Sequence, residues 1–281
     1  MVQEASKFVG QNKAKKLIAE WKVRDTFPHF LLVVGEEGSG RRSIAAEIAK
    51  SIECKMVTVE DLSVDSIRGV LDSAYLLDSK LMYVLPNADR MSIAAKNTLL
   101  KFTEEPPSNA YIIITLLSLD NTLPTLVSRS QHLILEPYTK EELLQLTNNN
   151  KYAAVATTPG MLKYFEAIGE DKLVDVVKFC DMVFTKIDKV SLANSFKSST
   201  RIKFKQKDEG FSINTFLATM DFVIDKQMSR AVSRSDYIRL SCWLKLLPKY
   251  KFLFSKLGMN QRAIYDKMIL EIREMLINRG A

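Results

Sequence analysis

Two short apolar runs with a helical segment between them constrain the fold of this chain most strongly. Residues 82–85 and 112–115 consist almost entirely of apolar side chains, so each is expected to be a buried strand. Residues 93–103 place apolar side chains at helical spacing, and the Pro-Pro pair at 106–107 ends that helix. A strand, a helix and a second strand in this order form a parallel crossover. The sequence therefore predicts an α/β domain built on a parallel sheet.

A glycine-rich loop follows another apolar run near the start of the chain. Residues 30–34 are apolar, the sequence GEEGSG occupies 35–40, and a helical segment comes next. This order is that of a P-loop, in which backbone N–H groups and a helix dipole hold phosphates. After its last glycine, such a loop needs Lys for the phosphates and Ser or Thr for the metal. This chain has Arg41 and Arg42 there, and Ser43 could serve only if the loop shifted by one residue.

The tract NTLLKFTEEPP at 97–107 and the triplet Ser128-Arg129-Ser130 carry a specific resemblance. Together they resemble the clamp-loader branch of the AAA+ ATPases, which has an NxLLKxxEEPP element and an SRC arginine-finger motif. Within that branch, the chain is most similar to the bacterial DNA polymerase III delta-prime type. The resemblance implies an α/β AAA+ P-loop-like core with a parallel sheet flanked by helices, followed by a small helical lid and an all-α collar.

The resemblance also indicates a damaged site for ATP hydrolysis. The family has Asp-Glu-Ala-Asp after the strand at 82–85, but this chain has Pro86-Asn87-Ala88-Asp89. The carboxylate that positions the metal and the one that orients the attacking water are both missing, and hydrolysis needs both functions. Arg129, by contrast, is intact at the position where the family presents its finger to a neighbouring subunit. A subunit of this type completes its neighbour's ATP site without hydrolysing ATP.

Further site residues follow from the resemblance alone. Vestigial nucleotide contacts are expected at Val9, Gly35, Gly38, Ser39, Gly40, Arg41, Arg42, Ser43, Thr115 and Gly160. Gly160 stands where active members place a sensor arginine. Contacts to DNA phosphates are expected from Arg90 and Lys96, for which a solvated helix face is an equal alternative.

No metal site and no required cofactor are predicted. The cysteines at 54, 180 and 242 are too widely separated for a zinc site or a disulfide framework. Delta-prime subunits commonly carry a four-cysteine zinc module, and its absence here leaves a phage or plasmid origin open. Binding of ATP or ADP without hydrolysis also stays open.

Composition sets the remaining expectations. Apolar residues make up 47% and charged residues 26% of the 281 residues, which is typical of a globular protein. The net charge of +7 favours a polyanionic partner to a modest degree. Neither a membrane span nor a secretory signal is recognisable, so a cytoplasmic location is expected. By resemblance, the partners are other clamp-loader AAA+ subunits, a sliding clamp and primer-template DNA, with no membrane.

The sequence predicts three domains and one function, for which two alternatives stay open. The nucleotide-binding-like α/β domain is expected at 1–137, the helical lid at 138–200 and the helical collar at 201–281. The predicted function is that of a non-hydrolysing, delta-prime-like clamp-loader subunit in DNA replication. One alternative is an active clamp-loader ATPase in which Arg41 and Ser43 replace the usual pair. The other is a degenerate AAA+ adaptor for replication or helicase loading.

Overall fold

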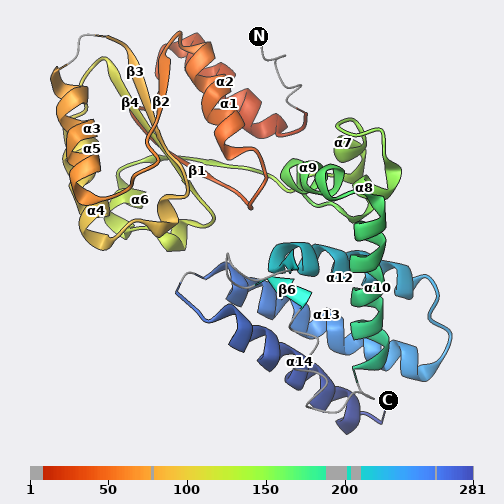
Figure 1. Ribbon diagram of the computed structural model, residues 1–281. Helices are drawn as coiled ribbons and strands as arrows, with labels where there is room; N and C mark the ends of the chain where they lie inside the picture. Colours follow the sequence, from red (N-terminus) through yellow and green to blue (C-terminus); the bar gives the residue numbers. More distant parts are fainter. Residues whose placement is uncertain (1–8, 77–78, 188–200, 204–209, 257, 281) are drawn as a thin grey trace. The chain divides into compact units, whose positions relative to one another are not determined.

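The computed structural model describes residues 9–76, 79–187, 201–203, 210–256 and 258–280. The chain divides into two compact units. Unit 1 extends to Leu146 and includes Thr158–Gly160, and unit 2 comprises Thr147–Thr157 and the chain from Met161 onward. Figure 1 shows that a sheet with flanking helices forms unit 1 and that helices dominate unit 2.

Unit 1 contains one five-stranded sheet and the helices that cover it. Its strands are β1 (Phe30–Val34), β2 (Lys55–Thr58), β3 (Leu81–Leu85), β4 (Ala110–Leu116) and β5 (Gln131–Ile134). Its α-helices are α1 (Asn12–Arg24), α2 (Arg41–Ser51), α3 (Val64–Leu76), α4 (Ile93–Thr98), α5 (Leu100–Glu104), α6 (Pro124–Ser128) and α7 (Lys140–Leu144). Two short 3-10 helices, η1 (Ala88–Arg90) and η2 (Leu119–Asn121), follow β3 and β4.

The sheet is parallel throughout, and its strands lie in the order β2-β3-β4-β1-β5. Strand β1 therefore lies between β4 and β5, and the glycine loop leaves its carboxyl end. The segment that follows β3 starts at the same edge. Strand β3 is the neighbour of β4 on the side away from β1. This order brings loops that are distant in sequence to one edge of the sheet.

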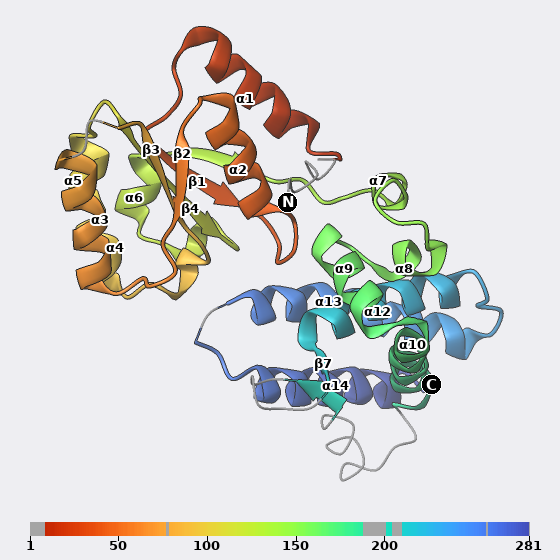
Figure 2. The same cartoon turned by 45° about the horizontal axis from the view of Figure 1, so that its top comes forward.

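Alternate side chains of the central strands β1, β3 and β4 enter two separate cores. One core packs Leu31, Val33 and Ile113 against α1 and α2. The other packs Leu32 and Ile112 against α3, α4, α5 and α6 on the opposite face, and Figure 2 shows this division. Because both faces are covered, the central strands are apolar at almost every position, with Thr115 of β4 as an exception, rather than alternating with polar residues. The predicted fold class, a parallel sheet flanked by helices and followed by a helical region, is confirmed.

The helix predicted over 93–103 is divided in the structure. Leu99 separates α4 from α5, and its N–H bonds the carbonyl of Lys96, three residues earlier, at 3.2 Å. Phe102 likewise donates to Leu99, at 3.1 Å. Both side chains are fully buried. The tighter turn places these two apolar groups in the same core, and the hydrophobic pattern alone did not reveal the break.

In the part that the structure describes, unit 2 consists of helices and one pair of two-residue strands. Its helices are α8 (Asn150–Val155), α9 (Pro159–Ile168), α10 (Glu170–Lys186), α12 (Ile213–Met228), α13 (Arg234–Ser255) and α14 (Gln261–Asn278), where the first residues of α9 belong to unit 1. The strands are β6 (Ile202–Lys203) and β7 (Phe211–Ser212), which pair in parallel.

The long carboxy-terminal helices agree with the apolar pattern. Ile264, Met268, Ile272 and Leu276 of α14 are buried, as their spacing predicts. The sequence pattern predicts a helix over 237–247 that ends before Pro248, and this prediction is too short. The helix continues through that proline to Ser255. Pro248 is exposed, so its ring faces solvent rather than the core, where the helix tolerates the missing N–H at the least cost.

The predicted division into domains at 137 and 200 stays a prediction. The two compact units separate near 146 and do not divide lid from collar, and residue 200 lies outside the described residues. Within the described parts of the chain, none of the helices combines the length and the apolar composition that a bilayer span requires.

Ile113→Ala should lower the free energy of unfolding by about 2–5 kcal/mol, because it leaves a cavity in the centre of the sheet. Its side chain is fully buried, whereas that of Ile93 is 69% exposed. Urea unfolding monitored by circular dichroism measures the difference. Ile93→Ala is the matched control and should change stability by about 0.5 kcal/mol or less. Equal losses for the two variants would contradict the burial of β4.

Candidate functional site

The glycine loop lies at the carboxyl edge of the sheet, between β1 and α2. Gly38 and Gly40 adopt positive φ angles of 79° and 91°, which only glycine accepts readily. Gly40 is the N-cap of α2 and gives that helix no side-chain cap. The backbone therefore retains the form of a P-loop, with the amino end of a helix behind its last glycine.

Arg41 is the first residue of α2, and its side chain is turned into the protein. The residue is only 8% exposed, and its Nη2 donates to Oδ1 of Asn87 at 3.1 Å. Its Nη1 has no hydrogen-bond partner among the described residues. Burial lowers the pKa of the guanidinium, although the carboxylates of Asp89 and Glu37 partly oppose this change. The position after the loop therefore holds a buried guanidinium of which only some N–H groups have hydrogen-bond partners.

The next two residues of the loop point outward. Arg42 and Ser43 are both exposed. Arg42 pairs with Glu60 through Nη2 and Oε2 at 3.2 Å. In this conformation, the structure does not bring Ser43 together with Arg41 at the buried side of the loop.

Asn87 connects the loop to the centre of the sheet. It follows β3 in a left-handed conformation with φ of 52°, and its N–H donates to Oγ1 of Thr115 at 2.9 Å. Thr115 lies on β4 and is buried. Arg41, Asn87 and Thr115 thus form one hydrogen-bonded chain along the carboxyl ends of β3 and β4. The sequence singled out each of these residues, but it gave no sign that they would bond to one another.

Gly160 closes over the loop. Its N–H donates to the carbonyl of Gly38 at 2.9 Å, and a Cβ added at Gly160 would lie 2.5 Å from Cα of Gly38. Such a distance requires the backbone to move, so only glycine fits. Tyr138 also binds the loop, since its hydroxyl donates to the carbonyl of Ser39 at 3.0 Å. Sequence reasoning missed Tyr138, which no motif marks.

The segment around Val9 is held by its neighbour Gln11 rather than by a ligand. Val9 is buried, and the Gln11 amide makes two bonds with the backbone of Glu136, at 2.6 and 2.8 Å. The role predicted for Val9 beside a nucleotide stays a prediction. Gln11 belongs to the Phe-Val-Gly-Gln box at 8–11, which resembles a motif of the family, but the sequence does not reveal Glu136 as its partner, because the contact links segments far apart in the chain.

The DNA contact predicted for Lys96 needs correction. Lys96 is only 6% exposed, and its Nζ donates to the carbonyls of Asn121 and Asp89 at 2.6 and 3.4 Å. Oδ1 of Asp89 in turn accepts the side-chain amide of Asn121 at 3.1 Å. Lys96 therefore joins η1 to η2 and does not face solvent. Arg90 is exposed, and its contact with DNA stays a prediction.

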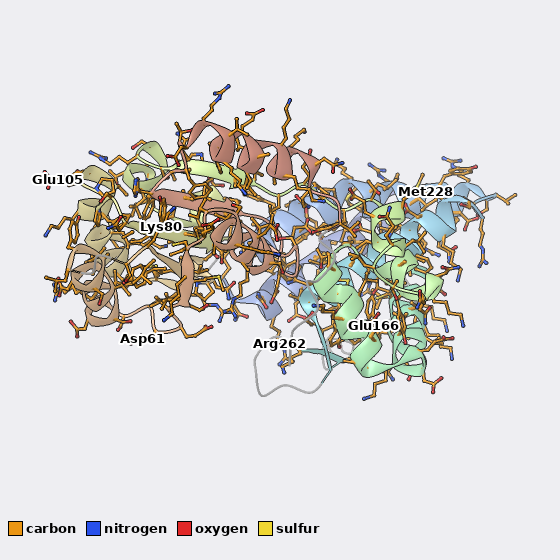
Figure 3. All side chains as sticks on the ribbon, turned by 90° about the horizontal axis from the view of Figure 1, so that it is seen from above. Asp61, Lys80, Glu105, Glu166, Met228 and Arg262 are labelled. Atoms are coloured by element: carbon orange, nitrogen blue, oxygen red, sulfur yellow. The ribbon has the colours of Figure 1, made fainter. Side chains whose placement is uncertain are left out.

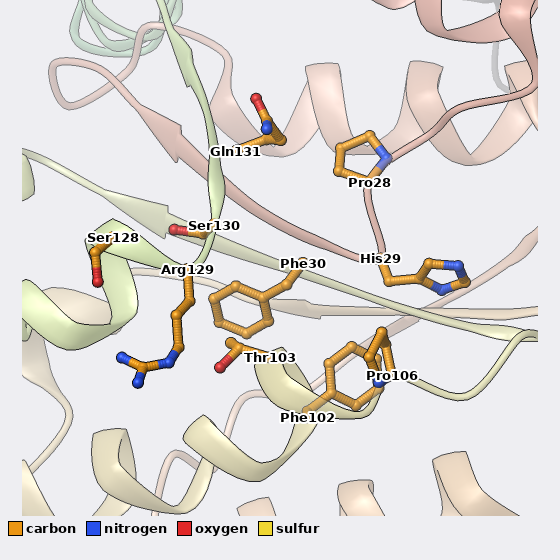
Figure 4. A pocket seen from close by; sticks show the side chains of 10 residues that line it. All are labelled: Pro28, His29, Phe30, Phe102, Thr103, Pro106, Ser128, Arg129, Ser130 and Gln131. Carbon is orange, nitrogen blue, oxygen red and sulfur yellow. The ribbon is translucent and has the colours of Figure 1, made fainter.

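Arg129 lies at the opposite edge of the sheet from the glycine loop. It follows α6 and precedes β5, and β5 runs parallel to β1. It lines a pocket with Phe30, the first residue of β1. In Figure 4, its side chain lies beside Phe30 and Thr103, and its guanidinium points away from Pro28. The side chain is 43% exposed.

Two groups contact the Arg129 guanidinium. Its Nε lies 3.5 Å from Oε1 of Glu104, and its Nη1 donates to the carbonyl of Thr125 at 3.3 Å. Glu104 ends α5, within the tract that carries the family resemblance. The two motifs recognised in the sequence, at 97–107 and 128–130, are therefore adjacent in space.

Comparisons with known proteins indicate which family this chain is similar to. The model of a family described as DNA polymerase III, delta subunit, matches residues 62–139. DNA polymerase III subunit gamma/tau from Mycoplasma pneumoniae is 23% identical over 68% of this chain and 33% of its own length. DNA polymerase III subunit delta' from Bacillus subtilis is 24% identical over 45% of this chain and 48% of its own length. The chain thus spans about a third to a half of these relatives.

A solved structure adds evidence on the fold alone. A variant of RuvB from Thermotoga maritima aligns with 97% of this chain and 88% of its own, with a TM-score of 0.50 and 15% identity. Taken together with the family match and the relatives, the predicted resemblance to AAA+ clamp-loader subunits is confirmed, and the delta-prime type is consistent with it.

Asn87→Gly should destabilise the protein by about 1–3 kcal/mol, because it removes the acceptor and leaves the buried Arg41 guanidinium unpaired. Glycine keeps the left-handed backbone, so strain does not confuse the result. Arg41→Met in the same chain should recover most of the loss, because an apolar side chain needs no acceptor. A double-mutant cycle in urea measures the coupling. Additive effects would mean that the two side chains do not interact.

Proposed function

We propose that this clamp-loader-type AAA+ chain acts in DNA replication as a non-hydrolysing, delta-prime-like subunit of a sliding-clamp loader. In that role it supplies Arg129 to the ATP site of a neighbouring subunit. The observation that carries the proposal is a contrast between two arginines of one domain. Arg41 is buried and bonded to Asn87 at the chain's own P-loop, whereas Arg129 is exposed at the opposite edge of the sheet.

The P-loop residues do not fit a magnesium nucleotide. A magnesium site needs hard oxygen ligands, but the groups at the ends of β3 and β4 are the Asn87 amide and the Thr115 hydroxyl, which contact each other or Arg41. The nearest carboxylate in the sequence, Asp89, receives the N–H of Leu117 at 2.8 Å instead. The buried cation of Arg41 would repel a metal ion. These features support the absence of hydrolysis at this chain's own site.

The sheet separates Arg129 from that same loop. The two sites lie at opposite ends of β1, and a strand of five residues spans about 16 Å. An arginine side chain is too short to cover that distance. Arg129 can therefore contact a γ-phosphate only if another subunit presents one, which supports a role in trans.

The partners of this role are proposed with it. They are other clamp-loader AAA+ subunits, the sliding clamp and primer-template DNA, in a cytoplasmic complex. Exposed Arg90 is the remaining candidate for a contact with a DNA phosphate, and such contacts weaken as salt concentration rises. No cofactor is required by this proposal, and ADP or ATP held without turnover remains compatible with it.

The two alternative functions differ in what they require of Arg41, Ser43 and Arg129. An active ATPase would need Arg41 to leave Asn87 and Ser43 to turn inward from its exposed position. An adaptor for replication or helicase loading would need neither change, and it would have no use for Arg129. The test of Arg129 therefore separates the proposed function from the adaptor, and turnover by the isolated chain separates it from the ATPase.

Arg129→Ala should leave folding and assembly intact but lower DNA-stimulated ATP turnover at the facing site of the complex by ~10³-fold or more. A guanidinium acts there by neutralising charge as the transition state forms. Arg129→Lys should rescue turnover poorly, because a point charge lacks the planar fork. Steady-state turnover of the complex recovered from its host gives the measurement.

The isolated chain is the control for this experiment and should show no turnover above background. Metal-dependent turnover by the isolated chain would favour the active-ATPase alternative. Unchanged turnover and clamp loading in the Arg129→Ala complex would favour the adaptor.

An exposed apolar stripe on α13 provides a surface for association with other subunits. Tyr237, Leu244 and Phe252 are 59%, 49% and 54% exposed, and exposed Pro248 lies between the last two. At 100° per residue, all four fall on one face of the helix. Large apolar side chains in a continuous exposed stripe are typical of interaction sites. We assign this stripe to packing against neighbouring subunits of the proposed complex.

The double change Leu244→Glu and Phe252→Glu should weaken association with the other subunits, because it puts charge into an apolar interface. The side chains are exposed, so the isolated chain should keep its circular dichroism spectrum and stability. Size-exclusion chromatography of co-expressed subunits measures assembly. Met228→Glu is the control, since Met228 is 52% exposed at the end of α12 (Figure 3). Equal assembly of both variants would exclude the stripe from the interface.

A further inference from the structure

Glu104 and Arg129 come from two anchored elements. Helix α5 ends at Glu104, and two residues before it Phe102 is fully buried in the core. The next residue, Glu105, is also held, since the Tyr75 hydroxyl donates to its carbonyl at 2.8 Å. On the other side, the N–H of Arg129 donates to the carbonyl of buried Leu126 at 3.3 Å. The backbone of each residue is therefore held in place independently of the contact between the two side chains.

We propose that Glu104 is a positioning residue for Arg129 and holds its guanidinium in the orientation that meets a phosphate of the neighbouring subunit. This inference rests on the proposed function, in which Arg129 acts in trans. The Glu104 carboxylate contacts Nε, and the Thr125 carbonyl contacts Nη1. Neither of these two groups contacts Nη2.

The remaining N–H groups suit an oxyanion. An arginine has five N–H donors, and the two contacts leave both donors of Nη2 and one of Nη1. These lie at the far end of the fork, where a phosphate can accept two parallel bonds. A side chain that is already oriented loses less conformational freedom on docking than a free one. The Glu104 contact is exposed to water, so it orients the arginine without trapping it.

Glu104 differs from the neighbouring carboxylate of Glu105 because Glu104 is paired with Arg129. Glu105 has the same charge and is also exposed, and Figure 3 labels it at the periphery of unit 1. Among the described residues, Arg129 forms an ion pair with Glu104 and with no other carboxylate. Glu105→Gln therefore makes the same change of charge one residue away from Glu104 without removing the contact.

The first measurement is hydrogen exchange of the Arg129 Nε–H group by NMR on the full chain. Arg129→Lys identifies its signal, because that signal disappears. Glu104→Gln should speed the exchange about two- to fivefold, the range of an exposed ion pair, and Glu105→Gln should not. Added salt should speed exchange in the parent chain and have less effect in Glu104→Gln, since the screened pair is already absent.

The second measurement is DNA-stimulated ATP turnover of the complex recovered from its host. Glu104→Gln should lower kcat about two- to fivefold, far less than Arg129→Ala, whereas Glu105→Gln should leave it unchanged. Exchange rates that respond equally to both glutamine variants would overturn the inference. So would a faster exchange in Glu104→Gln with unchanged turnover, if Arg129→Ala still abolishes turnover. If neither Glu104→Gln nor Arg129→Ala changes turnover, the proposed function fails, whatever the exchange rates show.

Discussion

The parallel pairing of β1 with β5 is the constraint on which the rest of unit 1 depends. Parallel strands begin at one edge of a sheet and end at the other. The loop after β1 and the turn before β5 therefore lie at opposite edges, separated by the length of a strand. One domain thus carries a P-loop at one edge and an arginine at the other, and the two cannot serve the same phosphate. A fold of this kind favours sites that are completed by a second subunit.

Environment, rather than residue type, distinguishes the two arginines. Arg41 has lost most of its water and gained one neutral acceptor, so burial lowers the pKa of its guanidinium. Placing another positive charge beside a buried guanidinium costs free energy, and so does leaving that guanidinium without a hydrogen-bond acceptor. Arg129 keeps much of its water and has donors left over. The same chemical group is therefore part of the protein interior at one edge and available to a ligand at the other.

The sequence predicted the sheet better than it predicted the contacts. Apolar runs gave β1, β3 and β4 because buried parallel strands need apolar residues on both faces. The break at Leu99 and the helix through Pro248 were missed, since tertiary packing and solvent exposure decide them. The DNA contact of Lys96 was predicted from the family resemblance, which does not reveal that two carbonyls at its Nζ allow its burial. The Gln11 and Tyr138 contacts span distant segments, which no local pattern encodes.

Gly38 and Gly160 approach each other so closely that the backbone at 160 covers the glycine loop. This approach is possible only because neither residue has a side chain. Gly38 and Gly160 meet at a distance where a Cβ on either would clash. In the resembled family, the position of Gly160 carries an arginine in active members, and an arginine there could not accept this contact. A side chain at position 160 and this closure over the loop therefore exclude each other. Arg41 is bonded to Asn87 beside the same loop, and both features support the proposal that this chain does not hydrolyse ATP at its own loop. In the proposed function, Arg129 is the guanidinium that acts on a nucleotide held by another subunit.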